Sequence, residues 1–303
     1  MGLLLVGVVA LAVVGVAVGR GVRGLAVPLD DLIEGARRIE GGEYRARVPE
    51  RPWGPPELRG LARAFNAMAA RLETDERQRR SLLADVSHEL RTPLSVLQGE
   101  LEAMVDGVHP ADGAHLAATL DETRVLSRLV EDLRTLALAE ARTLTLHREP
   151  TDLGVLAAEV AEGARVGRDP EREAVSVAVA DDVPLLDVDP VRIREVLSNL
   201  VANALRYTPP DAVARIAVTR SSTPARRPEV VVAVADDGPG ISPELLPHVF
   251  DRFAKSAESR GSGLGLAIAR QLVEAHGGWM AAESPSGGGT TVRFGLPIEP
   301  SGA

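Results

Sequence analysis

Residues 189–208, DPVRIREVLSNLVANALRYT, predict one amphipathic helix whose polar face is unusual. Asp189 suits the N-cap and Pro190 the first helical position, so the helix is expected to span 190–207. Its apolar face is formed by Ile193, Leu197, Leu200 and Ala204. Glu195, Asn199, Asn203 and Arg206 fall within about 80° of one another on the other side. Two asparagines in mid-helix would be unusual on a face that is merely solvated, because asparagine has a low helix propensity. Amide oxygens are suitable ligands for Mg²⁺ that is also bound by phosphates.

The segments around this helix alternate between helical and strand patterns. Strands are expected at 175–180, 214–218, 230–235 and 291–294, and further helices at 152–164 and 264–276. Such alternation predicts an α/β sandwich domain over residues 144–298, of ordinary domain size, followed by a short tail at 299–303.

Two glycine clusters lie in this domain. In VVVAVADDGPGIS (230–242) a strand leads into Asp236, Gly238 and Gly240, which read either as a tight turn or as a close approach of backbone to a ligand. GSGLGLAI (261–268) precedes a helix, where backbone N–H groups suit phosphate. The cluster at 261–268 lacks the spacing of a dinucleotide-binding fingerprint, and the chain has no Gly-Lys-Ser/Thr sequence of a Walker A loop.

Residues 74–143 predict two long helices that turn back at GVHPADGA (107–114). An apolar stripe runs along each helix at steps of three and four. The first stripe comprises Leu83, Val86, Leu90, Leu94, Leu97, Leu101 and Met104, and the second Leu126, Val130, Leu133 and Ala137. These stripes favour a helical hairpin that pairs with a second copy as a dimeric four-helix bundle.

The first of these helices carries SHELRTPL (87–94). Thr92 stands where a zinc-binding His-Glu-x-x-His motif needs its second histidine, so a zinc site is excluded. His88 points away from the apolar stripe and is therefore expected to be exposed. Glu89 can orient its imidazole or take a proton from it, and Pro93 is expected to kink the helix one turn later. We assign no function to the other histidines, His109, His115, His147, His248 and His276.

The first 19 residues carry no charge, about 28 Å of helix, and arginines follow at 20 and 23. A signal peptide would need a basic start and a shorter apolar run. We therefore expect a transmembrane helix at 1–20, with the remainder on the cytoplasmic side of the inner (cytoplasmic) membrane and any external sensor outside this chain. A helix opening at Pro28 and another from Glu57 to Arg71 flank a Pro/Gly-rich connector, so that 21–73 forms a juxtamembrane helix pair.

Taken together, the motifs resemble those of bacterial two-component sensor histidine kinases. Residues 21–73 resemble a HAMP signal-relay module, and SHELRTPL resembles the H-box. The stretches around Asn203, Asp236, Phe250 (in VFDRF) and Gly263 resemble, in order, the nucleotide boxes of the gyrase, heat-shock chaperone and histidine-kinase ATPase superfamily. The lid segment 254–260 is shorter than this resemblance leads us to expect.

The resemblance implies a role for each matching residue. His88 would be phosphorylated, with Glu89 as its acid/base partner and Thr92 used in dephosphorylating the partner protein. Asn203 would hold Mg²⁺ and Asp236 would recognise the adenine of ATP. The other implied nucleotide-binding residues are Asn199, Arg206, Tyr207, Gly238, Gly240, Phe250, Gly261, Gly263, Leu264, Gly265 and Thr290.

The sequence therefore predicts a homodimeric, membrane-anchored kinase that passes phosphate from ATP through His88 to an aspartate of a cognate response regulator. A net charge of −9 argues against nucleic acid as a partner. A degenerate kinase that only docks a partner is disfavoured by the intact motifs. An ATPase machine of the gyrase or chaperone type is disfavoured because Asn199 stands where that class uses a glutamate base.

Overall fold

The computed structural model describes residues 7, 11, 15, 26–51, 55–140, 143–165, 175–207, 212–221, 228–255, 262–285 and 288–298. The chain divides into two compact units, Met1–His88 and Glu89–Ala303. The predicted membrane span at 1–20 lies outside the described residues except at three positions. Within the described part of the chain, no helix combines the length and the hydropathy that a membrane span requires.

The first unit is built around a pair of helices and the connector between them. Residues 26–40 are helical and end, as predicted, at Gly41-Gly42, where Gly42 has a φ of 87°. The connector is fixed by Asn66, whose side chain accepts from the Val48 N–H at 2.8 Å and donates to the Val48 carbonyl at 2.9 Å. The core of the pair consists of Leu32, Val48, Ala62, Phe65 and Ala69.

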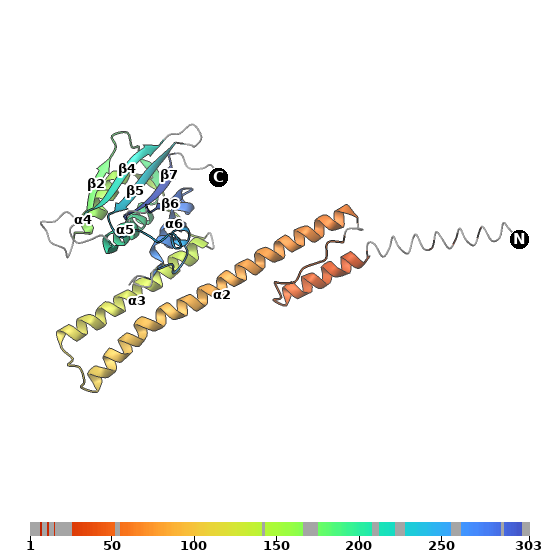
Figure 1. Ribbon diagram of the computed structural model, residues 1–303, viewed down its shortest axis with the longest axis horizontal. Helices are drawn as coiled ribbons and strands as arrows, with labels where there is room; N and C mark the ends of the chain where they lie inside the picture. Colours follow the sequence, from red (N-terminus) through yellow and green to blue (C-terminus); the bar gives the residue numbers. More distant parts are fainter. Residues whose placement is uncertain are drawn as a thin grey trace. The chain divides into compact units, whose positions relative to one another are not determined.

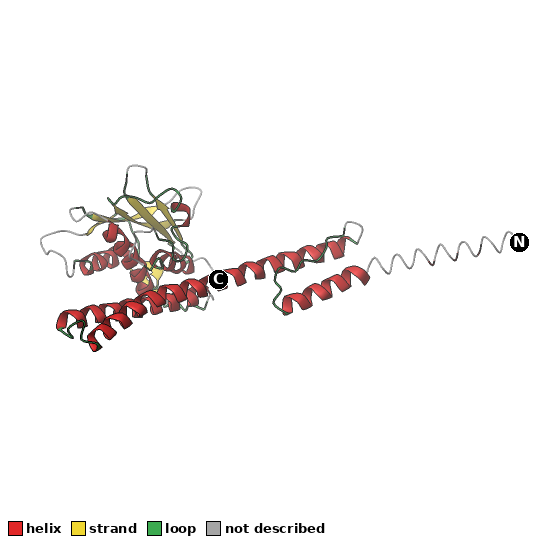
Figure 2. Ribbon diagram, turned by 60° about the horizontal axis from the view of Figure 1, so that its bottom comes forward, coloured by secondary structure: helices red, strands yellow, loops and turns green. Residues whose placement is uncertain are grey.

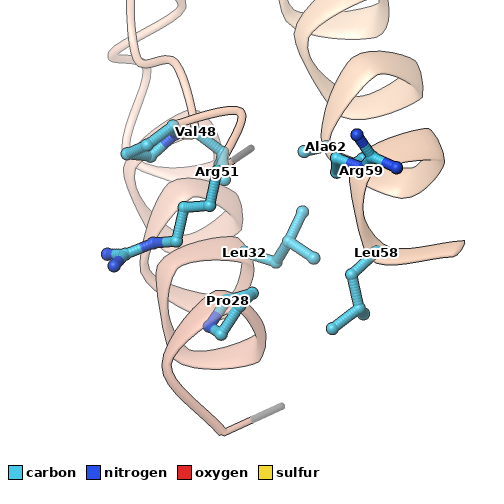
Figure 3. Close-up of a pocket in the computed structure, with 8 residues that line it drawn as sticks. Pro28, Leu32, Val48, Arg51, Leu58, Arg59 and Ala62 are labelled. Carbon is cyan, nitrogen blue, oxygen red and sulfur yellow. The ribbon is translucent and has the colours of Figure 1, made fainter. Parts of the chain in front are cut away.

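A cavity opens between these two helices beside the connector (Figure 3). It has an apolar floor that includes Leu32, Leu58 and Ala62, and Arg51 and Arg59 also line it. Arg51 is paired with Asp31 at 2.9 Å. None of the residues singled out for chemistry lines this cavity, so it belongs to the helix pair.

Helix α2 (Pro56–Val105) runs for 50 residues without a break (Figure 1). The expectation of one helix ending at Arg71 and another starting at Thr74 was therefore wrong. No glycine or proline interrupts residues 72–80, and Glu73 and Glu76 each form an i,i+4 ion pair, with Arg77 and Arg80. These pairs favour continuation of the helix. Pro93 lies inside α2 and does not end it.

Helix α3 (Gly113–Glu140) follows the turn expected at 107–114. The predicted apolar stripes are not buried within this chain: Leu83, Leu94, Leu101 and Val130 are all at least 42% exposed. The buried apolar residues of α3 are instead Leu129 and Leu136. The C-terminal half of α3 packs on helix α6 (Gly265–Ala275), so its buried side faces the α/β domain.

The α/β domain contains a five-stranded sheet in the order β2-β4-β5-β7-β6, in which only the β2–β4 pair is parallel. Its strands are β2 (Val175–Val179), β4 (Ala214–Ser221), β5 (Glu229–Asp236), β6 (Trp279–Glu283) and β7 (Thr290–Pro297). Two short strands, β1 (Glu149–Thr151) and β3 (Leu186–Val188), form a separate antiparallel pair. Strands β1, β3 and β6 were not predicted, because two are three residues long and β6 lacks a clear alternation.

Helices α4 (Leu153–Gly163), α5 (Pro190–Tyr207) and α6 cover the sheet on one face (Figure 2). The limits of α5 are those predicted. Strand β5 alternates regularly, with Val230, Val232 and Val234 buried and the residues between them partly exposed. These valines face the apolar side of α5, which produces a two-layer α/β sandwich.

Candidate nucleotide and phosphoacceptor sites

The polar face of α5 carries the two predicted asparagines. The Nδ2 of Asn199 is buried and has no hydrogen-bond partner among the described residues. A Cβ added to Gly265, the first residue of α6, would lie 3.4 Å from the Asn199 Oδ1. An amide donor buried without a partner is costly, so its position beside the start of α6 fits a site that a polar ligand completes.

The start of α6 itself has donors to offer. Among the described residues, no side chain caps its first turn, so its leading backbone N–H groups are available to an anion. Asn203 lies one turn after Asn199 and is partly exposed. Its side chain forms no hydrogen bond within the part of the chain that the structure describes. The two amides and the α6 N-terminus therefore fit a phosphate group together with a hard cation such as Mg²⁺.

Asp236 ends β5 and continues the row of buried valines, so its side chain faces the helical layer. Its Oδ1 accepts from the Gly238 N–H at 2.9 Å. Thr290 is its cross-strand partner on β7, and the Thr290 backbone N–H also bonds the carboxylate. Burial raises the pKa of Asp236, and these two N–H groups oppose that rise. The carboxylate is thus held in place at the end of the strand.

The glycines of the DDGPG turn are needed for close backbone packing. A Cβ on Gly238 would lie 2.8 Å from the Asp236 carboxylate and 2.9 Å from the carbonyl oxygen of Tyr207, the last residue of α5. Gly240 has a φ of 83°, and a Cβ there would lie 2.8 Å from the Ser284 hydroxyl. The turn is therefore pressed between the end of α5 and the loop before β7. This brings Asp236, Gly238 and Tyr207 together.

The second glycine cluster packs against the VFDRF segment. Gly263 has a φ of 71°, and a Cβ would approach the Phe253 backbone to 2.7 Å. The Phe253 N–H donates to the Gly263 carbonyl at 2.9 Å, which joins the two ends of the lid segment. Phe250 lies under the Arg270 guanidinium of α6, 5.8 Å from its ring centroid. Gly261 and residues 256–260 of the lid lie outside the described residues. Leu264 is fully buried.

His88 is exposed on α2, as expected, and Thr92 is exposed one turn later. Glu89 is held by a residue that the motifs did not reveal: the Lys255 ammonium lies 2.6 Å from its Oε1. Their side chains are only 33% and 20% exposed. Lys255 lies two residues after the VFDRF segment (249–253), so this ion pair joins the lid end of the α/β domain to the residue beside His88. The separation of 166 positions along the chain explains why no sequence spacing could have indicated the contact.

One histidine assigned no function is a structural residue. His276 is only 2% exposed. Its Nδ1 donates to the Leu272 carbonyl at 2.7 Å, and its Nε2 accepts from the Asp189 N–H at 3.1 Å. Burial lowers its pKa, so the ring is neutral. The ring therefore joins the end of α6 to the N-cap of α5, whose Asp189 Oδ1 accepts from the N–H groups of Val191 and Arg192.

Glu195, at the N-terminal end of the same polar face, lies near α3. Burial and the charge of Glu195 raise the pKa of Asp132 on α3 to about 6. Glu195 is itself paired with Arg192 at 2.9 Å. This end of the predicted polar face therefore lies near helix α3 of the hairpin.

Three family models match the chain in succession. They are the HAMP domain at residues 21–74, the His Kinase A (phospho-acceptor) domain at 78–142, and the histidine kinase-, DNA gyrase B- and HSP90-like ATPase at 188–300. Signal transduction histidine-protein kinase BaeS of Escherichia coli is 37% identical over 91% of this chain and 59% of its own length. Signal transduction histidine-protein kinase AfsQ2 of Streptomyces coelicolor is 35% identical over 90% of this chain and 53% of its own length.

Solved structures give the same result. The Acinetobacter baumannii histidine kinase AdeS superposes with a TM-score of 0.57 at 28% identity, covering 70% of this chain and 98% of AdeS. Full-length ShkA in complex with AMPPNP superposes with a TM-score of 0.51 at 28% identity, covering 74% of this chain and 47% of ShkA.

The fold, the site and these relatives define a class, the proteins that join a HAMP module and a phosphoacceptor hairpin to a gyrase-type ATPase domain. The chain belongs to the two-component sensor histidine kinases. It spans a little over half the length of the curated relatives it matches, 59% and 53%.

Proposed function

We propose that this chain is an ATP-dependent protein-histidine kinase that phosphorylates His88 and passes the phosphoryl group to an aspartate of a response regulator. The observation that carries the proposal is the buried Nδ2 of Asn199, which has no hydrogen-bond partner among the described residues and lies beside the first residue of α6. A phosphate chain placed there meets amide and backbone donors, and Asp236 at the end of β5 is positioned to accept from the adenine amino group. The AMPPNP bound to the relative ShkA supports a nucleotide at this site.

In the proposed reaction a ring nitrogen of His88 attacks the γ-phosphorus, the bond to the bridging oxygen breaks, and ADP leaves. Glu89 takes the proton of the imidazole as the new bond forms. Asn199, the α6 N-terminus and Arg206 neutralise the charge that collects on the phosphate oxygens. Mg²⁺ held by the Asn203 oxygen would supply further charge neutralisation when bound. The chain thus contributes positioning and electrostatics.

The exposed stripes of α2 and α3 support a homodimer in which a second copy covers them. The uncharged run at 1–19 and the arginines after it support a membrane anchor with the catalytic part cytoplasmic. Thr92, one helical turn from His88, would orient water on the phosphorylated regulator and so assist its dephosphorylation.

The proposal is tested with His88→Ala in the full chain. We expect incorporation of labelled γ-phosphate to be abolished while the ATP dissociation constant stays within a few-fold of wild type, because the nucleotide residues lie in another domain. The label on wild type should be acid-labile and base-stable, as a phosphoramidate is. Acid-stable label on a serine or threonine, or label that survives in the variant, would refute the assignment of His88.

A further inference from the structure

Beside the proposed adenine site, Arg215 and Asp237 form a two-pronged ion pair. The two terminal nitrogens of Arg215 lie 2.8 and 2.6 Å from the two carboxylate oxygens of Asp237. Arg215 stands on β4 directly across from Ala235 of β5. The pair therefore ties β4 to the turn that leaves β5, one residue beyond Asp236. Planar, bidentate pairing of this kind fixes orientation as well as distance.

Packing fixes most of the DDGPG turn (236–240), and the Arg215–Asp237 pair restrains the part that packing leaves exposed. Gly238 is closed in by Asp236 and Tyr207, and its carbonyl accepts from the Gly289 N–H at 2.7 Å. Asp237, between Asp236 and Gly238, is exposed, as is Pro239. Arg215 restrains the Asp237 side chain. It thereby also restrains the Asp237–Gly238 peptide, whose N–H donates to the Asp236 Oδ1.

Electrostatic interactions link the side chains of Asp236, Asp237 and Arg215. Asp236 is buried, and its pKa is raised by that burial and further by the Asp237 carboxylate, whereas Arg215 lowers it. The hydrogen bonds from Arg215 hold the pKa of Asp237 below its usual range. Arg215 thus compensates a neighbouring negative charge that would favour protonation of the buried carboxyl group. An ionised Asp236 accepts from the 6-amino group of adenine, whereas a protonated one can donate to the 6-oxo group of guanine.

We propose that Arg215 and Asp237 are a positioning pair that sets the orientation and charge of Asp236, and with it the selectivity of the site for adenine nucleotides. The proposal rests on the proposed function, in which Asp236 receives the adenine ring. Neither residue is among those assigned to the phosphates in the proposed reaction. The side chains of Arg215 and Asp237 are 53% and 48% exposed, and exposed pairs contribute little to global stability. The effect should therefore be seen in nucleotide binding.

The test measures ADP and GDP binding to the full chain at pH 7.5 and pH 6.0. For Arg215→Ala we expect the ADP dissociation constant to rise roughly threefold to tenfold at pH 7.5, as for loss of a charge-assisted hydrogen bond. The rise should be larger at pH 6.0, where Asp236 is more readily protonated, and the preference for ADP over GDP should narrow. The rate of autophosphorylation at saturating ATP should be unchanged, since only binding is affected.

Two further variants separate positioning from a structural role. Asp237→Asn, added to Arg215→Ala, removes the uncompensated charge and should restore most of the ADP affinity and the wild-type pH profile. Arg293→Ala is the matched control, because it breaks another exposed cross-strand pair of the same sheet, Arg293 with Glu283 at 2.9 Å. It should leave ADP and GDP binding unchanged.

Wild-type affinity and pH profile in Arg215→Ala would overturn the inference while leaving the kinase assignment intact. So would an affinity loss that Asp237→Asn fails to restore and that comes with a lower melting temperature, since the pair would then be structural. A wild-type chain that binds no ADP would refute the proposed function itself, and this inference with it.

Discussion

At the scale of single residues, the two asparagines of α5 have different surroundings although they lie one turn apart. Both side chains are partly exposed, but the Asn199 Nδ2 is buried beside the start of α6 and finds no partner among the described residues. A buried polar atom left unpaired lowers stability by about 1–3 kcal/mol. A bound nucleotide that accepts a hydrogen bond from the Asn199 Nδ2 would explain why the domain retains this donor.

We therefore predict opposite effects of Asn199→Ala on stability and on binding. Alanine removes the unpaired donor and is a better helix former by about half a kcal/mol, so the melting temperature should not fall. The ATP dissociation constant should rise about tenfold, as expected for one lost hydrogen bond to a charged group. Ser198→Ala, at the exposed neighbouring position, serves as the control and should change neither. A lower melting temperature with unchanged ATP affinity would show that Asn199 is structural.

The Lys255–Glu89 pair gives a second prediction at this scale. Glu89→Gln keeps the size of the side chain and a hydrogen bond to Lys255 but cannot take a proton. We expect autophosphorylation to fall by about 10²–10⁴-fold, the usual contribution of a general base, with ATP binding unchanged. Lys255→Met breaks the same ion pair but leaves the carboxylate, so its rate should fall by less than about tenfold. Equal losses in both variants would assign Glu89 to docking of the lid end instead of proton transfer.

At the scale of elements, α5 and α6 are connected at the edge of the domain by one buried histidine. His276 accepts from the backbone of Asp189, which caps α5, and donates to the last turn of α6. Because burial lowers its pKa, the folded domain holds it neutral, whereas the unfolded chain protonates it below about pH 6.5. The unfolded state then binds more protons, so this group removes stability as the pH falls below that value.

His276→Gln tests this linkage. Gln can still accept from the Asp189 N–H but does not titrate, so the variant should be less stable than wild type by about 1 kcal/mol at pH 8, where only the Leu272 hydrogen bond is lost. The difference in the free energy of unfolding between wild type and the variant should shrink or reverse between pH 6.5 and pH 5, because only the wild type loses stability through protonation of His276. Thermal unfolding of both proteins across this pH range measures it. A difference that stays constant with pH would contradict a neutral buried His276.

At the scale of the whole molecule, one continuous helix serves both compact units. Helix α2 begins in the N-terminal helix pair, carries His88, and ends at the turn of the hairpin. Because hydrogen bonds join each residue to the residue four positions earlier, an unbroken α-helix rotates as one body. A rotation at the N-terminal end of α2 is therefore expected to be relayed to His88.

This relay predicts that insertions after Gln78 act through helical phase. Two inserted alanines rotate the following face by about 200°, whereas seven residues return it to within about 20° of its original direction. We expect the two-residue insertion to change basal autophosphorylation several-fold and the seven-residue insertion to leave it close to wild type. The measurement is labelled-phosphate incorporation by the full chain. If both insertions behave as wild type, the continuity of α2 has no role in control.

Local patterns by themselves determined much of this protein. The limits of α5, the strand character of β5 and the exposure of His88 follow from periods of 3.6 and 2 residues, which short stretches of sequence express directly. The break at 107–114 and the close packing of Gly238 and Gly263 follow from residue types whose backbone preferences are local. For the same reason, the motifs that resemble a kinase could be recognised before any contact was known.

Only the tertiary structure decided which distant residues meet. Lys255 and Glu89 are 166 residues apart, Asp189 and His276 87, and Arg215 and Asp237 22, and no periodicity relates the members of such pairs. The buried state of His276 and the unpaired amide of Asn199 likewise arise from how α5, α6 and the loops pack. The unbroken course of α2 was missed because helix boundaries depend on side-chain pairs as well as on propensity. Contacts of this kind form only when the chain closes on itself, and they are what position the chemistry that the motifs supply.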